Sequence, residues 1–229
     1  MNPGGIGPAS RALRYWERRQ QVVSNNLANV STPGFKAERV FARLLADGGP
    51  EAGTRDDFRS GSVAPTGRPL DVAIEGDGFL VVKTDAGERY MRGGSFRLDE
   101  LGGLVTDDGA AVLGESGPIV LPPGEVRLEE NGTIHVDGAP VGRLRVERPD
   151  GTPVREGANL WVPDGEGDEV PREEIHVRQG HLEESNVDPV GALVEMIEIQ
   201  RAYSAVQRSI QAADGVMQTI TSDLGRLDR

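Results

Sequence analysis

Apolar side chains recur at helical spacing near both ends of the chain. Near the start, the residues three and four positions apart are Leu13, Trp16, Gln20, Val23, Leu27 and Val30. They form one face of a helix predicted to begin at about Ser10. Pro33 and Gly34 are predicted to end it, because proline lacks an N–H donor and glycine permits a left-handed turn.

The pattern at the other end is longer. Asp188 is a good N-cap, and Pro189 suits the first helical position. A stripe then follows at the same spacing: Leu193, Met196, Gln200, Tyr203, Val206, Ile210, Ala213, Met217, Ile220, Leu224 and Leu227. Roughly 36 residues of helix would be about 54 Å long. A small β body cannot cover such a helix, so it needs a second helix beside it, which the first segment supplies.

Between the helices the pattern is that of β-structure, from Gly61 to about Gly180. Residues 70–74 and 143–147 alternate between apolar and polar, and residues 79–82 form a short apolar run expected of a strand covered on both faces. Turn signals such as Asp107-Asp108-Gly109 recur roughly every ten residues, which is typical of a sandwich or barrel of short antiparallel strands.

One hairpin is predicted in detail, around Asn131-Gly132. A two-residue turn would set Leu128 opposite His135 and place the apolar residues on opposite faces. A three-residue loop with a glycine bulge would instead pair Leu128 with Val136 and Glu130 with Ile134. This bulged form gathers the apolar residues on one face, and we predict it.

The predicted fold class is therefore α+β. The terminal helices form an antiparallel-type coiled-coil module, and an all-β antiparallel domain is inserted between them. The predicted divisions are residues 1–36 for the first helix and loop, 37–60 for a linker or short extension, 61–180 for the β-rich domain, and 181–229 for the last helix. The segment 37–60 fits a short strand or helix around residues 40–45 and a loop at residues 47–53.

Composition and charge exclude several classes of function. The net charge of −12 argues against a nucleic-acid partner, and no apolar run is long enough for membrane insertion. There is no cysteine, so neither disulfides nor thiolate chemistry are expected. Met1 to Ser10 lacks the apolar stretch of a cleavable signal peptide, so the ordinary export route is not expected. The first helix is basic and the last is acidic, so they can attract each other.

Catalytic and metal sites are not indicated. His135, His176 and His181 lack the spacing of metal ligands, and no nucleophile motif is present. The acidic loop at residues 164–169 departs from a calcium loop at two positions, Glu169 and Ile175. We therefore expect no enzyme activity, no cofactor and no metal.

Three motifs resemble those of the flagellar rod and hook family. Residues 24–36 (SNNLANVSTPGFK) resemble its N-terminal signature, and the similarity continues through residues 66–79 and 94–96. It resumes at residues 179–188 and 198–203. The pattern is most similar to the proximal and distal rod proteins of the hook-basal-body group. Leu80 and residues 91–94 depart from the family pattern.

The resemblance implies a structural subunit of the bacterial flagellar axial shaft. In that family the terminal helices form an inner coiled-coil layer and the β middle forms outer layers. Subunits are exported unfolded through the flagellar type III apparatus and polymerise helically across the periplasm. The implied partners are other copies of the chain, other rod and hook subunits, and the export apparatus.

Candidate site residues lie on the helices and at their ends. We expect a core seam formed by Leu13, Trp16, Val23 and Leu27 against Leu193, Met196, Tyr203 and Ile210, with Gln200 either setting the register or facing solvent. Junction and neighbour contacts are expected from Asn25, Asn26, Asn29, Phe35, Ser185 and Asn186. Two alternatives stay open: a secreted β-rich adhesive module with a coiled-coil stalk, and a glycosidase with paired carboxylates.

Overall fold

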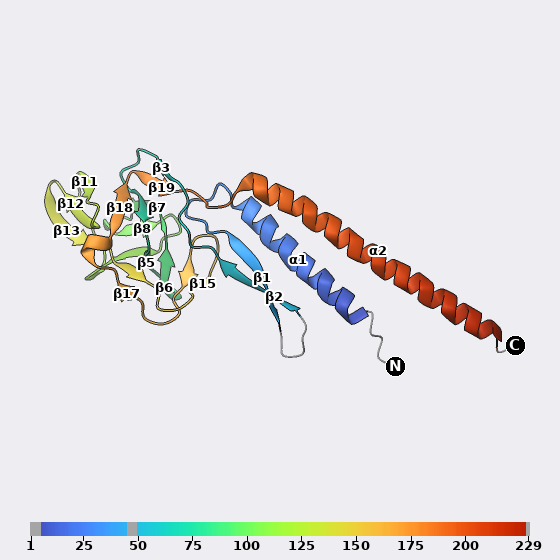
Figure 1. Ribbon diagram of the computed structural model, residues 1–229. Coiled ribbons are helices and arrows are strands. Elements are labelled where there is room, and N and C mark those ends of the chain that lie inside the picture. Colours follow the sequence, from blue (N-terminus) through green and yellow to red (C-terminus); the bar gives the residue numbers. More distant parts are fainter. Residues whose placement is uncertain (1–5, 45–49, 228–229) are drawn as a thin grey trace. The chain divides into compact units, whose positions relative to one another are not determined.

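The computed structural model describes residues 6–44 and 50–227, and it has the predicted α+β composition (Figure 1). The chain divides into two compact units. The helical unit contains both long helices and residues Glu38–Asp57, and the β unit contains Asn29–Ala37 and Phe58–Val187. The predicted divisions differ, because residues 29–36 and 181–187 belong to the β unit while most of 37–60 belongs to the helical unit.

The elements of the helical unit are α1 (Ile6–Ala28), β1 (Glu38–Leu44), β2 (Pro50–Asp56) and α2 (Pro189–Leu227). Those of the β unit are β3 (Val63–Pro65), β4 (Asp71–Glu75), β5 (Phe79–Thr84), β6 (Gly87–Met91), β7 (Gly93–Leu98), β8 (Leu104–Thr106), β9 (Ala111–Gly114), β10 (Gly117–Pro118), β11 (Val126–Leu128), β12 (Thr133–Val136), β13 (Ala139–Arg143), β14 (Val146–Arg148), β15 (Val154–Arg155), β16 (Trp161–Val162), β17 (Asp168–Glu169), the 3-10 helix η1 (Arg172–Glu174), β18 (His176–Gln179) and β19 (His181–Glu183).

Both predicted helices are present. α1 begins at Ile6, four residues before the predicted start, and ends at Ala28. A turn follows through Gly34, whose φ of 70° suits glycine. α2 begins at Pro189 as predicted, and the Asp188 carboxylate accepts a hydrogen bond from the Val190 N–H at 3.1 Å. This is the N-cap geometry that the sequence indicates.

The segment that the sequence left undecided is a hairpin. β1 and β2 pair antiparallel, with Glu38 opposite Asp56 and Val40 opposite Thr54. Residues 50–53, predicted to belong to a loop, are part of β2, and the first three positions of that predicted loop lie outside the described residues.

The β unit is built from short antiparallel strands. Its largest sheet has the order β15-β16-β6-β5-β9-β8-β7-β4-β18, with β10, β14 and β17 attached beside it. β11, β12 and β13 form a separate sheet, and β19 pairs with β3. All the strand pairs in the described part of the chain are antiparallel, as predicted.

The core of the β unit lies on both faces of β5, as the continuous apolar run predicts. Leu80 and Val82 belong to one buried cluster, and Phe79 and Val81 belong to a second cluster with Tyr90 and Trp161. The Tyr90 hydroxyl donates to Glu147 at 2.8 Å. Burial and this hydrogen bond raise the pKa of Tyr90.

The hairpin at Asn131-Gly132 has the predicted bulged loop but a different register. Leu128 lies opposite Ile134, and Val126 lies opposite Val136. The predicted pairing of Leu128 with Val136 is therefore wrong, because the observed partner lies two residues earlier in the chain. In such a three-residue loop a glycine with left-handed backbone takes the last position, and Gly132, with a φ of 83°, is that glycine. The loop therefore spans residues 130–132. The four apolar residues still share the face that packs on the core.

Candidate assembly interface

The helical unit is held together along one face of each helix. α1 and α2 lie side by side and run in opposite directions (Figure 1). The Arg19 guanidinium donates to the Glu195 carboxylate at 3.0 Å from Nε. The Tyr203 hydroxyl donates to Glu17 at 3.1 Å, which raises the pKa of Tyr203. The Arg19–Glu195 ion pair is a contact of the kind that a basic first helix and an acidic last helix predict.

The face between the helices differs in part from the predicted seam. Val23 is buried, and the other predicted residues of α1 are half-buried: Leu13, Trp16 and Leu27. On α2 the predicted residues Met196, Tyr203 and Ile210 are half-buried. The buried positions are Ala192 and Ile199, which lie seven residues apart on one face. Coiled-coil packing of this face stays a prediction.

Leu193 is 51% exposed in the single chain, where Ala192 is turned inward instead. Its place in the predicted seam stays a prediction. Gln200 is also exposed, so it faces solvent and does not set the register from a core position. The stripe at threes and fours allowed either Ala192 or Leu193 to face α1, since the two are adjacent on the helix. Whether Leu193 contacts a neighbour stays a prediction.

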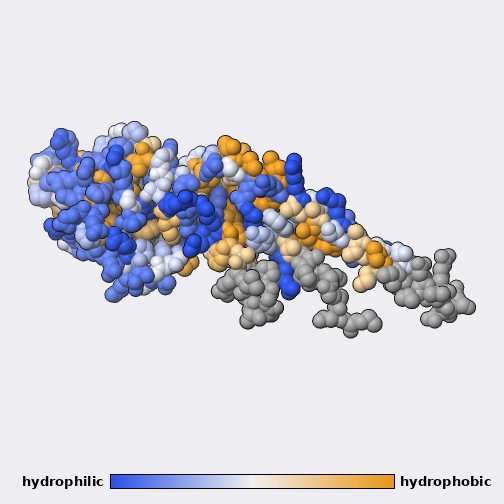
Figure 2. Space-filling model, viewed as in Figure 1, coloured by the Kyte–Doolittle hydropathy of each residue, from blue (hydrophilic) through white to orange (hydrophobic). Residues whose placement is uncertain are grey.

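A second apolar face runs along the start of α2, and we call it the outer stripe. Its members are Val190, Leu193, Val194 and Ile197, which are 69%, 51%, 52% and 51% exposed. Their spacing of three and four residues puts them on one side of the helix, opposite Ala192 and Ile199. Hydrophobic surface gathers along the helical unit in Figure 2, while the visible face of the β unit is mainly hydrophilic. Clustered exposed apolar side chains of this kind are typical of a protein contact surface.

Asn26 joins α1 to the hairpin. Its side-chain amide donates to the Glu38 carbonyl at 2.8 Å and accepts from the Glu38 N–H at 2.9 Å. The amide thus pairs with the first residue of β1 as a strand would. Asn26 is buried, so it is a junction residue within the chain, and Asn25 is exposed beside it. Asn29 accepts a hydrogen bond from the Thr32 hydroxyl at 3.2 Å within the following turn.

The β unit contains a buried charge cluster that sequence reasoning missed, formed by Lys36, Glu183 and Arg92. The Lys36 ammonium donates to the Glu183 carboxylate at 2.6 Å, and the Arg92 Nε donates to the other oxygen at 3.3 Å. All three side chains are at most 2% exposed. Arg92 also donates to the carbonyls of Gly76 and Gly78. Each ion is thus compensated, which buried charges require.

The cluster unites three segments that are distant in sequence. Lys36 closes the N-terminal motif, Arg92 lies between β6 and β7, and Glu183 ends β19. The motif letters GFK and HLEES contain the charges, but nothing in their spacing indicates that they are buried together. Tertiary packing decides this, and a charged residue within a polar segment gives no burial signal.

The other predicted junction residues also act within the β unit. The Asn186 side chain accepts from the Ala37 N–H at 2.7 Å and donates to the Arg59 carbonyl at 2.8 Å. Phe35 is buried beneath the Arg155 guanidinium, 4.6 Å from its ring centroid. Ser185 accepts from the Val187 N–H at 3.3 Å. Phe35 is therefore a junction contact within the β unit, and whether it also contacts a neighbouring subunit stays a prediction.

Within the described residues, no group of three or more His, Asp or Glu side chains is placed to hold a metal ion. None of the helices in the described part of the chain has the length and apolar character to span a membrane. The acidic loop at residues 164–169 is largely exposed.

Three family models match separate parts of the chain. Residues 9–36 match the model described as flagella basal body rod protein. Residues 73–138 match the D1 domain of the flagellar hook proteins FlgE/F/G, and residues 178–223 match the C-terminal model of the flagellar basal body rod proteins FlgEFG. The three matches follow the same order as the three sequence motifs.

Curated relatives are similar over nearly the whole chain. The flagellar basal-body rod protein FlgF of Caulobacter vibrioides is 34% identical, over 92% of this chain and 94% of the relative. The FlgF protein of Escherichia coli is 34% identical, over 91% and 92%. The flagellar basal-body rod protein FlgG of Bacillus subtilis is 29% identical, over 92% and 95%.

Proposed function

The chain belongs to the flagellar basal-body rod protein family, and we propose that it polymerises helically through its terminal helices to form part of the axial rod. Members of this family are structural and non-enzymatic, so the chain is a structural protein of the flagellar basal body. The relatives give no support to an adhesive module. The proposed partners of the chain are further copies of itself and other rod and hook subunits.

The observation that carries the polymer proposal is the outer stripe. Each apolar side chain that moves from water into an interface contributes about 1.5–3 kcal/mol. The stripe lies on the side of α2 opposite the buried residues Ala192 and Ile199, so a neighbouring subunit could cover it without displacing α1. A contact between two different surfaces extends into a helical array when its rotation does not close a ring.

The length of α2 supports the same proposal. α2 has 39 residues and α1 has 23, so the helices differ by about 24 Å at 1.5 Å per residue. Residues 211–219 of α2 are all exposed. This section continues the predicted seam through Ala213 and Met217. In a polymer, we expect helices of neighbouring subunits to cover it.

The proposal also includes the export route and the location of the subunit. We expect the subunit to pass unfolded through the flagellar type III apparatus and to assemble in the periplasmic part of the rod. The helical unit suits this route because it has a small core of its own and gains most from neighbours.

A substitution in the outer stripe tests the polymer proposal. Ile197→Asp places a charge on the exposed stripe without touching the face toward α1, so folding should be retained. Sedimentation velocity and negative-stain imaging of the full chain should show association at least about tenfold weaker, since the lost burial alone exceeds about 1.4 kcal/mol. Ser209→Asp is the matched control, because it adds the same charge at an exposed position of the same helix, where the side chain bonds only the Ala205 carbonyl. Equal assembly of the two variants would refute the role of the stripe.

A further inference from the structure

The β unit carries a groove rimmed by arginine side chains, which we call the arginine groove. It has a volume of about 880 Å³ and lies between the turn before β4, the end of β7 and the start of β11. Its lining includes the apolar residues Leu70, Leu98 and Val126 together with Arg68, Arg97 and Arg127, and one carboxylate, that of Glu125. An apolar floor with a cationic rim is suited to a segment that carries carboxylates.

Gln179 holds the groove in shape. Its amide nitrogen donates to the Pro69 carbonyl at 2.8 Å and to the Val126 carbonyl at 2.9 Å. Its amide oxygen accepts from the Leu128 N–H at 3.0 Å. The fully bonded side chain of Gln179 therefore joins the turn before β4 to β11. A preformed groove binds a partner with a smaller entropy cost than a mobile one.

The arginines of the groove have few anionic partners within the chain. The Arg97 side chain has no hydrogen-bond or ion-pair partner among the described residues. Arg127 pairs with Glu125 at 3.3 Å, where both side chains are strongly exposed and such pairs are weak. Arg68 lies 3.6 Å from the buried Asp71. In a chain of net charge −12, a group of three exposed arginines is a local exception.

We propose that the arginine groove receives the acidic loop of a second copy of this chain, residues 164–169, a contact that rests on the proposed assembly. The loop has four carboxylates in six residues, Asp164, Glu166, Asp168 and Glu169, and no basic residue. β16 and β17 anchor its two ends, so Glu166 is presented from a fixed turn. This assigns a use to the acidic loop, which the sequence left without a function.

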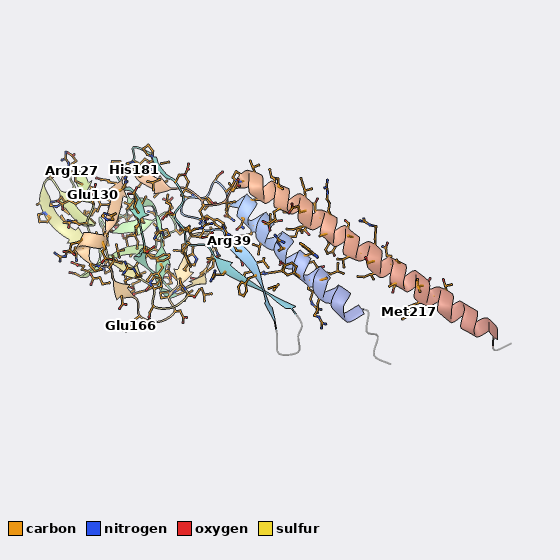
Figure 3. All side chains as sticks on the ribbon, viewed as in Figure 1. Arg39, Arg127, Glu130, Glu166, His181 and Met217 are labelled. Carbon is orange, nitrogen blue, oxygen red and sulfur yellow. The ribbon has the colours of Figure 1, made fainter. Side chains whose placement is uncertain are left out.

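The positions of the two surfaces agree with an extending contact. Figure 3 shows Arg127 and Glu166 on different sides of the β unit. A loop on one side that docks into a groove on another side of the next copy makes a heterologous contact, which propagates along a polymer. The proposed assembly would then have two sets of contacts, one through the helices and one through the β units.

A charge swap tests the contact in the full-length chain. Arg97→Glu and Glu166→Arg should each weaken association about tenfold at low ionic strength, because each sets like charges against each other. The double variant restores opposite charges and should return association to within about threefold of the unmodified chain. Lys83→Glu is the matched control, since it reverses an exposed cation outside the groove and should leave association unchanged.

A labelled peptide of residues 161–170 gives a readout that needs no polymer. It should bind the full-length chain in fluorescence anisotropy, bind the Lys83→Glu variant equally, and bind Arg97→Glu at least about fivefold more weakly. Absence of peptide binding, or equal association of the Arg97→Glu and Lys83→Glu variants, overturns the proposal. Ile197→Asp separates the helical interface from the groove contact. If Ile197→Asp abolishes assembly and the charge swap has no effect, only the proposed groove contact is refuted. If the charge swap weakens assembly and Ile197→Asp has no effect, only the proposed role of the helical interface is refuted.

Discussion

At the scale of single residues, one buried carboxylate joins several segments of the β unit. Glu183 accepts hydrogen bonds from the Lys36 ammonium, the Arg92 Nε and the Gly61 N–H. Two cations and one backbone donor thus bind the same buried carboxylate. The Gly34 N–H also donates to the Glu183 carbonyl at 2.7 Å. Glu183 therefore fixes the turn after α1 to the sheet pair of β3 and β19.

Replacing that carboxylate with an amide should be strongly destabilising. Glu183→Gln keeps the shape but leaves two buried cations without a counter-charge, which costs about 3–5 kcal/mol. Urea unfolding followed by tryptophan fluorescence measures this through Trp161, which is fully buried in the β unit. Glu184→Gln is the control: it removes the same charge from the adjacent exposed position and should cost less than about 1 kcal/mol. Similar losses in the two variants would mean that the cluster is not important for stability.

At the scale of elements, the hairpin β1–β2 depends on α1. A two-stranded hairpin is marginal by itself in water. Here Asn26 pairs with both backbone groups of Glu38, and the Arg18 guanidinium donates to Glu38 and to the Thr54 hydroxyl. The motif SNNLAN thus ends a helix and also supplies the polar group that positions the next element.

Asn26→Ala should release the hairpin from α1. The variant leaves the Glu38 N–H and C=O without their partner, and unsatisfied groups of this kind cost about 1–3 kcal/mol. Hydrogen exchange of the amides of β1 should accelerate accordingly, while that of β5 should not change. Ser24→Ala, an exposed site in the same turn of α1, should leave the exchange of β1 unaltered. Unchanged exchange of β1 in Asn26→Ala would show that the amide pair does not hold the hairpin.

The elements also show how far the sequence predicts the fold. Local signals are sufficient for α2, because Asp188 and Pro189 mark its start and a long stripe follows. They are sufficient for β5, whose apolar run needs cover on both sides. They fail for the register of β11 and β12, where a loop shift of one residue moves each pairing by two. They also leave β1 and β2 undecided, since Asn26, not local propensity, positions the hairpin.

The site is less predictable than the fold for a physical reason. Periodicity identifies a helix face, but two adjacent apolar residues such as Ala192 and Leu193 both fit it. Only the packing of α1 decides that Ala192 is buried and Leu193 is exposed. Likewise, charges at Lys36 and Glu183 look like ordinary surface residues in the sequence. Their burial depends on contacts between residues 147 positions apart.

At the scale of the whole molecule, the two units differ in how much core each has by itself. The β unit has two apolar clusters around β5. In the described part of the helical unit, the buried side chains are Val22, Val23, Asn26, Ala192 and Ile199. Helices recover little of their ordering entropy without packing. We therefore expect the terminal helices of an isolated subunit to be partly disordered and to become ordered by assembly.

Native-state hydrogen exchange measures this difference directly. In the isolated subunit at low concentration, amides of α2 should exchange at least about tenfold faster than those of β5, because opening the helical unit exposes little apolar surface. On assembly, the exchange of α2 should slow while that of β5 stays the same, since neighbours cover the helices and not the core of the β unit. The Ile197→Asp variant should keep the fast exchange of α2 at concentrations where the unmodified chain is protected. Slow exchange of α2 in the isolated subunit, equal to that of β5, would mean that the helical unit is stable alone and that assembly does not order it.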